Sequence, residues 1–325
     1  MCKNYYVTIY AIVMLKLSFY GRKVKLKRFG TNLFLESKTG YAASMKSASK
    51  AGFKFVDFDL TEHNDPPYDQ EEKFFSEVKR VADGEGVTLN QAHAPYMKGI
   101  RSDYDYFLGK DFERRVRDSI RRAGYLGIPY LVEHPFECYP KGYESEKMPL
   151  PEHKVMDKEV FDRNVEFFSK FKDDLKRYNV KMAIENCYLH DFVGRKHAPA
   201  ICSRSVEMNA LIDQLGDDHY CVCFDNGHLN LIDCEKISDY VKNVGKRIKV
   251  LHLHDNFGIQ NDWFGELDRH LLPFLGSFDW QNFKTALDGI GFDGVYSFES
   301  SVYGPVQLID DYYRLMFKSA QIIFD

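Results

Sequence analysis

Residues 220–256, YCVCFDNGHLNLIDCEKISDYVKNVGKRIKVLHLHDN, decide the fold. The stretch begins with a short apolar run, continues through a segment with apolar residues at helical spacing, and ends in a second apolar run. The first run ends in Asp225 and the second in His254, and both residue types bind metals. Two such strands joined by a helix predict a parallel sheet with a right-handed crossover.

The same alternation of strand and helix extends from residue 29 to the end of the chain. We expect strands at 29–35, 53–60, 88–94, 130–133, 181–186, 220–225, 249–254 and 294–299, and helices at about 42–51, 69–83, 110–126, 157–178, 204–215, 235–246, 279–290 and 305–323. This order predicts an α/β fold in which residues 29–325 form one (β/α)8 TIM barrel. An open doubly wound sheet is disfavoured, because FGTN at 29–32 lacks the glycine spacing of a dinucleotide-binding turn.

Local signals mark several boundaries and two long loops. Gly52 and Gly127 follow helical patterns where a left-handed residue is expected, and Asp157 is expected to cap the longest helix. Loops at about 135–156 and 187–203 follow the fourth and fifth strands, on the side of a barrel where active sites form. We predict that they act as lids or binding loops.

The composition is typical of a globular protein, with 44% hydrophobic and 28% charged residues among 325. A net charge of −4 disfavours a nucleic-acid substrate, because nucleic-acid binders carry a basic face. Seven cysteines without a CxxC pair predict a reduced, cytoplasmic protein. Residues 1–28 form an extension of unclear role, and their apolar part is too short to span a bilayer, so no membrane partner is expected.

Residues that bind metals fall at the ends of consecutive predicted strands or in the loops that follow them. Apolar strands deliver these side chains to one rim, and buried charged residues are normally paired or bound to a metal. The set is His93, His134, Glu185, Asp225, His228, His254, Asp268, His270 and Glu299. Mixed imidazole and carboxylate ligands suit a divalent ion such as Zn²⁺, Mn²⁺ or Co²⁺ better than an ion that prefers thiolates.

Other polar residues near these strand ends have weaker signals. His252 lies on the same strand face as His254 but one layer deeper, and we interpret it as a core or supporting residue. Asp57 and Asp59 share a face at the end of the second strand and could orient a ligand. Four basic residues in rim loops fit either an anionic substrate group or a solvated surface: Lys98, Arg101, Arg195 and Lys196.

At these residues the sequence resembles the xylose-isomerase-like barrel superfamily. That group includes sugar-phosphate isomerases, ketose 3-epimerases and type-IV apurinic endonucleases, and the resemblance covers residues 29–325. The motifs that carry it are Glu185-Asn186, Asp225-x-Gly-His228, His252-x-His254-Asp255, Asp268-x-His270-Leu-x-Pro with the following Gly276 and Asp279-Trp280, and Glu299.

The resemblance to ketose epimerases implies one divalent ion held by Glu185, Asp225, His254 and Glu299. Glu185 and Glu299 would then act as the catalytic pair, one removing a proton next to a carbonyl and the other returning it on the opposite face. The substrate-binding residues expected from this reading are His228, Arg269 and Tyr96. Arg269 is the nearest arginine to the segment FGIQ at 257–260, where epimerases of this type often carry one.

The resemblance to the apurinic endonucleases implies three Zn²⁺ ions held by nine residues, and all nine have counterparts in the set of strand-end residues given above. Such a cluster activates water and binds a phosphodiester during hydrolysis. Tyr96 follows His93 at the position where that family places residues that insert into DNA.

From these observations we expect a cytoplasmic, metal-dependent isomerase or epimerase that acts on a sugar or sugar phosphate. It would use one divalent ion, either Mn²⁺, Zn²⁺, Co²⁺ or Mg²⁺. The alternative is a multi-zinc phosphoesterase with up to three Zn²⁺ ions and a nucleic-acid substrate. A non-catalytic sugar-binding barrel is disfavoured, because the full set of metal ligands is present. The sequence is compatible with a homo-oligomer.

Overall fold

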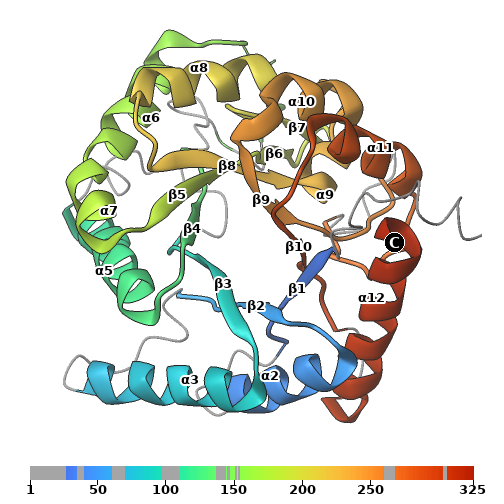
Figure 1. Cartoon of the computed structure of the whole chain (residues 1–325). Coiled ribbons are helices and arrows are strands. Elements are labelled where there is room, and N and C mark those ends of the chain that lie inside the picture. Colours follow the sequence, from blue (N-terminus) through green and yellow to red (C-terminus); the bar gives the residue numbers. More distant parts are fainter. Residues whose placement is uncertain are drawn as a thin grey trace, which may run out of the picture.

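Eight parallel strands curve into a barrel, and helices surround it (Figure 1). The structure is a computed structural model that describes residues 27–34, 40–60, 70–96, 110–136, 144, 147–150, 152, 154–259, 268–302 and 306–325. The barrel strands are β1 (Arg28–Asn32), β2 (Phe55–Asp57), β3 (Thr88–His93), β4 (Tyr130–Glu133), β5 (Lys181–Glu185), β8 (Tyr220–Asp225), β9 (Ile248–His252) and β10 (Val295–Phe298). The predicted TIM barrel is therefore confirmed.

The barrel closes between β9 and β10. The sheet order is β10-β1-β2-β3-β4-β5-β8-β9, so these two strands are the ends that must meet. One bridge between Leu253 and Phe298 joins them. In it the Leu253 amide donates to the Ser297 carbonyl at 2.9 Å, and the Glu299 amide donates to the Leu253 carbonyl at 2.9 Å. We call this bridge the β9–β10 seam.

The helices lie outside the strands, as alternation requires. They are α2 (Gly40–Ala51), α3 (Glu71–Glu85), α5 (Lys110–Leu126), α6 (Lys158–Ser169), α7 (Lys172–Tyr178), α8 (Ser205–Leu215), α10 (Ile237–Val244), α11 (Trp280–Ile290) and α12 (Ile309–Phe324), with shorter turns α9 (Asn226–Asn230), η3 (Gly245–Arg247) and η4 (Val306–Leu308). No helix in the described ranges is long and apolar enough to cross a membrane.

The prediction of one helix over 157–178 is wrong, because the structure divides it into α6 and α7. The Tyr220 hydroxyl donates to the Phe168 carbonyl at 2.5 Å, so a side chain uses this backbone acceptor near the end of α6. The Phe171 amide bonds back to the same carbonyl at 3.1 Å in a tight turn. Phe167, Phe168 and Phe171 are all buried at this break, so the turn lets three rings enter the core.

The two long loops differ in outcome. The loop predicted at 187–203 contains an antiparallel hairpin of β6 (Tyr188–Asp191) and β7 (Lys196–Pro199). The loop predicted at 135–156 lies partly outside the described residues, as do most of the extension 1–28, Lys98 and Arg101. Gly52 and Gly127 have the expected positive φ, +118° and +74°.

Asp157 caps α6 as expected, because its side chain accepts from the amides of Glu159 at 3.1 Å and Val160 at 3.3 Å. We predict that Asp157→Ala lowers the free energy of unfolding by about 1 kcal/mol, since these amides lose their acceptor. Urea unfolding would measure the change. Lys158→Ala, at the exposed first position of the helix, is the control and should change stability by less than about 0.5 kcal/mol. Equal losses in both variants would contradict the capping role.

The interior of the barrel changes from apolar to polar along four of the strands, β4, β5, β8 and β9. A small cluster of Val132, Ala183, Cys221, Cys223 and Val250 fills the lower interior. Side chains two residues further along a strand point to the same face. That step leads from Val132 to His134, from Ala183 to Glu185, from Cys223 to Asp225, and from Val250 to His252. The alternation of the strands thus collects polar side chains at the carboxyl end of the barrel.

Candidate metal centre

The nine residues expected from the sequence all belong to three of four groups of candidate ligands at the carboxyl end of the barrel. The fourth group contains Glu185, Cys223 and His252 and shares two of these residues with the middle group described below. In each group, every residue offers one ligand atom within 4.8 Å of the others. His252 joins them as a tenth residue.

The first group contains His93, His134 and Glu185. Glu185 Oε2 lies 3.4 Å from His93 Nε2 and 3.1 Å from His134 Nε2. The two imidazole Nε2 atoms lie 3.2 Å apart. The ring of Tyr96 lies beside both histidines, with centroid distances of 4.6 Å and 4.7 Å. Three donors therefore converge next to an aromatic side chain.

The middle group contains Glu185, Asp225, His252 and Glu299. His252 Nδ1 lies 2.9 Å from Glu185 Oε1 and 3.0 Å from Glu299 Oε2. The four-residue set expected from the resemblance named His254 in this place, whereas the structure groups His252 with the three carboxylates. His252 and His254 point to the same face of one strand, so the sequence pattern did not show which layer meets the carboxylates.

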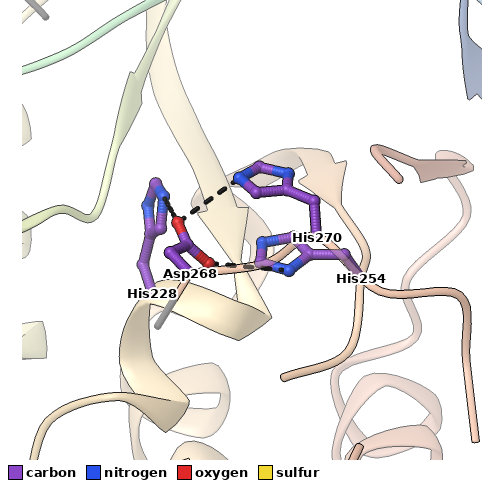
Figure 2. A group of neighbouring side chains, drawn as sticks. All are labelled: His228, His254, Asp268 and His270. Carbon is purple, nitrogen blue, oxygen red and sulfur yellow. Dashed lines mark ion pairs between the residues drawn. The ribbon is translucent and has the colours of Figure 1, made fainter. Parts of the chain in front are cut away.

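The third group contains His228, His254, Asp268 and His270 (Figure 2). Asp268 Oδ2 lies 3.3 Å from His228 Nε2 and 3.3 Å from His270 Nε2. Asp268 Oδ1 lies 3.8 Å from His254 Nδ1. The rings of His254 and His270 stack with centroids 3.9 Å apart. Figure 2 shows the carboxylate of Asp268 between these rings and that of His228.

Glu185 joins the first two groups, because each of its oxygens faces a different set of imidazoles. Oε2 faces His93 and His134, while Oε1 faces His252. The Glu185 side chain is only 1% exposed. Burial alone would raise the pKa of Glu185, but the imidazoles of His252, His134 and His93 outweigh it and hold this pKa well below its usual range.

In the third group, burial and neighbouring charged side chains have opposite effects on the pKa values, as they do for Glu185. Burial opposes a low pKa for Asp268, yet His270, His254 and His228 hold that pKa well below its usual range. Burial also opposes protonation of His270, but Asp268 outweighs it and raises the pKa of His270 to about 10. Each carboxylate thus requires positive charge beside it, which either protons or a cation can supply.

The tautomers show that a divalent ion fits this demand. A ring nitrogen that faces a carbonyl must carry the proton. His93 Nδ1 donates to the Ala94 carbonyl, His228 Nδ1 to the Asn186 carbonyl and His270 Nδ1 to the Glu299 carbonyl, each at 2.8 Å. In the neutral rings each Nε2 then carries a lone pair that faces a carboxylate oxygen. Such pairs repel unless a cation lies between them, and this outer hydrogen bonding is typical of histidines that bind metals.

Two asparagines hold the strand ends that carry these ligands. Asn186 accepts from the Asp225 amide at 2.9 Å and donates to the Asp225 carbonyl at 2.8 Å. Asn226 holds His254 in the same way, at 3.0 Å and 2.8 Å. These roles were not predicted from the sequence, although each asparagine directly follows a strand-end carboxylate.

Asp255 fastens the segment that supplies Asp268 and His270. Its carboxylate accepts from the Phe274 amide at 2.9 Å, the Phe278 amide at 3.1 Å and the Trp280 indole at 3.1 Å. Its backbone pairs with Leu271 in both directions at 2.8 Å. We call this arrangement the Asp255 hub. It connects the end of β9 to residues 271–280 and so fixes the third group.

The other predicted residues lie around the three groups. Arg269 is exposed between Asp268 and His270, and Arg195 and Lys196 are exposed at the tip of the β6–β7 hairpin. Asp57 lies deeper in the barrel, where Ser297 and Gln91 donate to it and burial raises its pKa to about 7.

Comparisons with known proteins agree with this arrangement. The family model described as "Xylose isomerase-like TIM barrel" matches residues 45–316. A curated "Probable endonuclease 4" from Metamycoplasma arthritidis is 27% identical over 210 residues, covering 62% of this chain and 66% of that protein. "Uncharacterized protein y4fM" from Sinorhizobium fredii is 33% identical over 104 residues, covering 32% of this chain and 31% of that protein. The chain thus spans less than two thirds of these relatives.

Among solved structures, a "D-tagatose 3-epimerase-like protein" matches 91% of this chain and 98% of its own length. The TM-score is 0.67 and the sequence identity is 20%. At this identity the likeness concerns the fold alone.

Proposed function

Because the chain belongs to the xylose isomerase-like TIM barrel family, we propose that it is a multinuclear metalloenzyme that hydrolyses phosphoesters. This proposal places the phosphoesterase ahead of the isomerase that we expected from the sequence. The observation that carries it is the position of Glu185 between two groups of ligands. A carboxylate that offers one oxygen to each of two sites is suited to a pair of neighbouring ions.

The same observation disfavours Glu185 as a base that meets a sugar. Both of its oxygens face imidazoles, and its side chain is 1% exposed. A base must lie within hydrogen-bond reach of the proton that it removes. Glu185 is therefore assigned to holding ions rather than to moving a substrate proton.

Divalent ions held by these groups would supply Lewis acidity to a phosphoester and to an attacking water. The residues of the chain would bind and orient the reactants. Glu299 is 29% exposed, so its carboxylate is accessible to accept a proton from water. Tyr96 beside the first group would pack against the substrate next to the scissile bond. Arg269, Arg195 and Lys196 on the rim would contact further phosphates.

A nucleic-acid backbone is the phosphoester that this arrangement fits best. The named relative from Metamycoplasma arthritidis, a probable endonuclease, supports that class of substrate. The exposed rim cations give local positive charge despite the net charge of −4.

A sugar or sugar-phosphate isomerase or epimerase is the second candidate, and the accessibility of Glu299 favours it. Glu299 and Glu185 both contact His252 Nδ1, so the two carboxylates meet at one imidazole nitrogen. A single ion in the middle group would serve that reaction, with Glu299 as the proton-transferring residue. His228 would bind a substrate oxygen in this reading.

The number of metal ions per chain separates the two candidates. We expect about three zinc ions per chain in protein purified without chelator, because the four groups of ligands form three separate positions once the two groups that share Glu185 and His252 are taken together. Elemental analysis would measure this number, and a DNA duplex with one abasic site would test cleavage. About one ion per chain, together with epimerisation of a ketose and no cleavage of DNA, would reverse our ranking.

A further inference from the structure

We propose that Phe274 contacts the substrate, and that its ring stacks on a nucleobase near the phosphoester that is cleaved. This inference rests on the proposed function and adds a residue that selects nucleic acid over other phosphoesters.

Phe274 has a backbone conformation that a phenylalanine rarely adopts. Its φ is +73°, in the left-handed region, where a bulky side chain is strained and glycine is not. Packing of the ring does not offset this cost, because the side chain is 51% exposed and lies outside the hydrophobic core of the described residues. Strain of this kind is found at functional sites, so it supports a task for the exposed ring.

Hydrogen bonds on both sides hold Phe274 in this conformation. The Phe274 amide donates to Asp255 Oδ2 at 2.9 Å, and the Leu275 amide donates to the Leu272 carbonyl at 3.2 Å. The next residue, Gly276, packs so closely that a Cβ there would lie 2.2 Å from the Asn256 carbonyl oxygen. The Asp255 hub therefore presents Phe274 on a fixed backbone.

The same segment carries residues of the metal centre. Phe274 follows His270 by four positions, and Asp255, which accepts from its amide, directly follows His254. Arg269 is exposed in this segment too. Proteins hold nucleic acids by combining cations that meet the backbone with aromatic rings on which bases stack. Phe274 supplies the second element beside a centre proposed to bind the backbone.

A second copy of the chain is a poorer occupant of this surface. The segment at 257–259 lies alongside, because the Ser277 amide donates to the Asn256 carbonyl at 2.8 Å. The exposed apolar side chains on the two segments are Phe257, Ile259, Phe274 and Leu275. A stable interface between proteins takes about 20–30 residues on each side. A patch of this size fits one or two bases better.

Phe274→Gly in the zinc-loaded full chain is the test, because glycine removes the ring and adopts the left-handed backbone without strain. The Tm should stay unchanged or rise by up to about 2 °C. The Kd for a nicked product duplex should rise at least about 5-fold, since stacking of one base on an aromatic ring contributes about 5–150-fold. KM should rise with it while kcat stays close to wild type, because the ring binds the ground state and the transition state alike. A lower Tm with an unchanged Kd would assign the ring to packing and overturn the inference.

Two further variants isolate the ring. Phe274→Tyr keeps an aromatic ring and should restore wild-type binding. Asn179→Gly is the matched control, because Asn179 is also left-handed, with φ +54°, but ends α7 just before β5, at the opposite end of the barrel. This control should leave the Kd unchanged. A rise in Kd that is equal in Asn179→Gly and Phe274→Gly would contradict a contact made by the ring.

A set of duplexes that each lack one further base near the abasic site would identify the stacking partner. The loss of affinity caused by Phe274→Gly should disappear for one of these duplexes, because the ring then has no base to contact. An equal loss on every duplex would reject stacking.

The same measurements separate this inference from the proposed function. If the wild-type chain cleaves abasic DNA and Phe274→Gly keeps the wild-type Kd and KM, stacking is rejected and the proposed function stands. If the wild-type chain neither binds nor cleaves DNA, the proposed function itself is rejected. If Phe274→Gly dissociates a dimer without changing the Kd, the segment is an interface between copies and the inference is overturned.

Discussion

Glu185→Gln should abolish the activity of this protein and remove the ions of the first two groups while leaving its fold intact. The change keeps the size of the side chain but removes the charge on which three imidazoles converge. We expect turnover to fall by at least about 1000-fold, since loss of one electrostatic stabiliser alone costs about 100–1000-fold. Zinc should fall from about three ions per chain to about one.

Glu133→Gln is the matched control for this experiment. Glu133 is equally buried, at 1% exposed, and it ends the neighbouring strand β4. Burial raises the pKa of Glu133 well above its usual range, so an uncharged Gln is a close replacement. The control should keep its zinc and its activity. A Glu185→Gln chain with wild-type zinc content would reject the bridging role of Glu185.

Asp255→Ala should lower the free energy of unfolding by at least about 3 kcal/mol, because three buried donors would lose their acceptor at a cost of about 1–3 kcal/mol each. Those donors are the amides of Phe274 and Phe278 and the indole of Trp280. The segment that supplies Asp268 and His270 would lose its anchor at the same time. Urea unfolding and zinc analysis would measure the two effects.

Asp279→Ala is the control for the Asp255 hub, because Asp279 lies in the same segment but only caps α11 at 3.0 Å. It should cost about 1 kcal/mol and leave the zinc content unchanged. If both variants lose the same stability and both keep their zinc, the hub does not position the third group.

Much of this arrangement could be predicted from the sequence, because strands alternate and end at one rim. The barrel follows from the regular succession of apolar runs and amphipathic segments. The nine ligand candidates follow from the residue type at each strand end or in the segment after it, and the structure brings all nine together.

The remaining features depend on contacts between distant residues. His252 and His254 have the same periodicity, so only packing against Glu185 and Glu299 distinguishes the deeper from the upper imidazole. The break between α6 and α7 depends on the hydroxyl of Tyr220, which is 52 positions away from Phe168. The Asp255 hub likewise depends on donors that are 19 to 25 positions away.

The β9–β10 seam has a consequence for how long the protein survives without metal. A single bridge closes the barrel there, and the contact between His252 and Glu299 spans the same two strands. Ions bound by the middle group would therefore hold β9 and β10 together where a single bridge joins them. Without them the amides of Leu253 and Glu299 would exchange hydrogen with solvent first, because local opening starts where the fewest contacts resist it. Proteases would then degrade metal-free chains faster than metal-bound chains, so the cell would retain the metal-bound form.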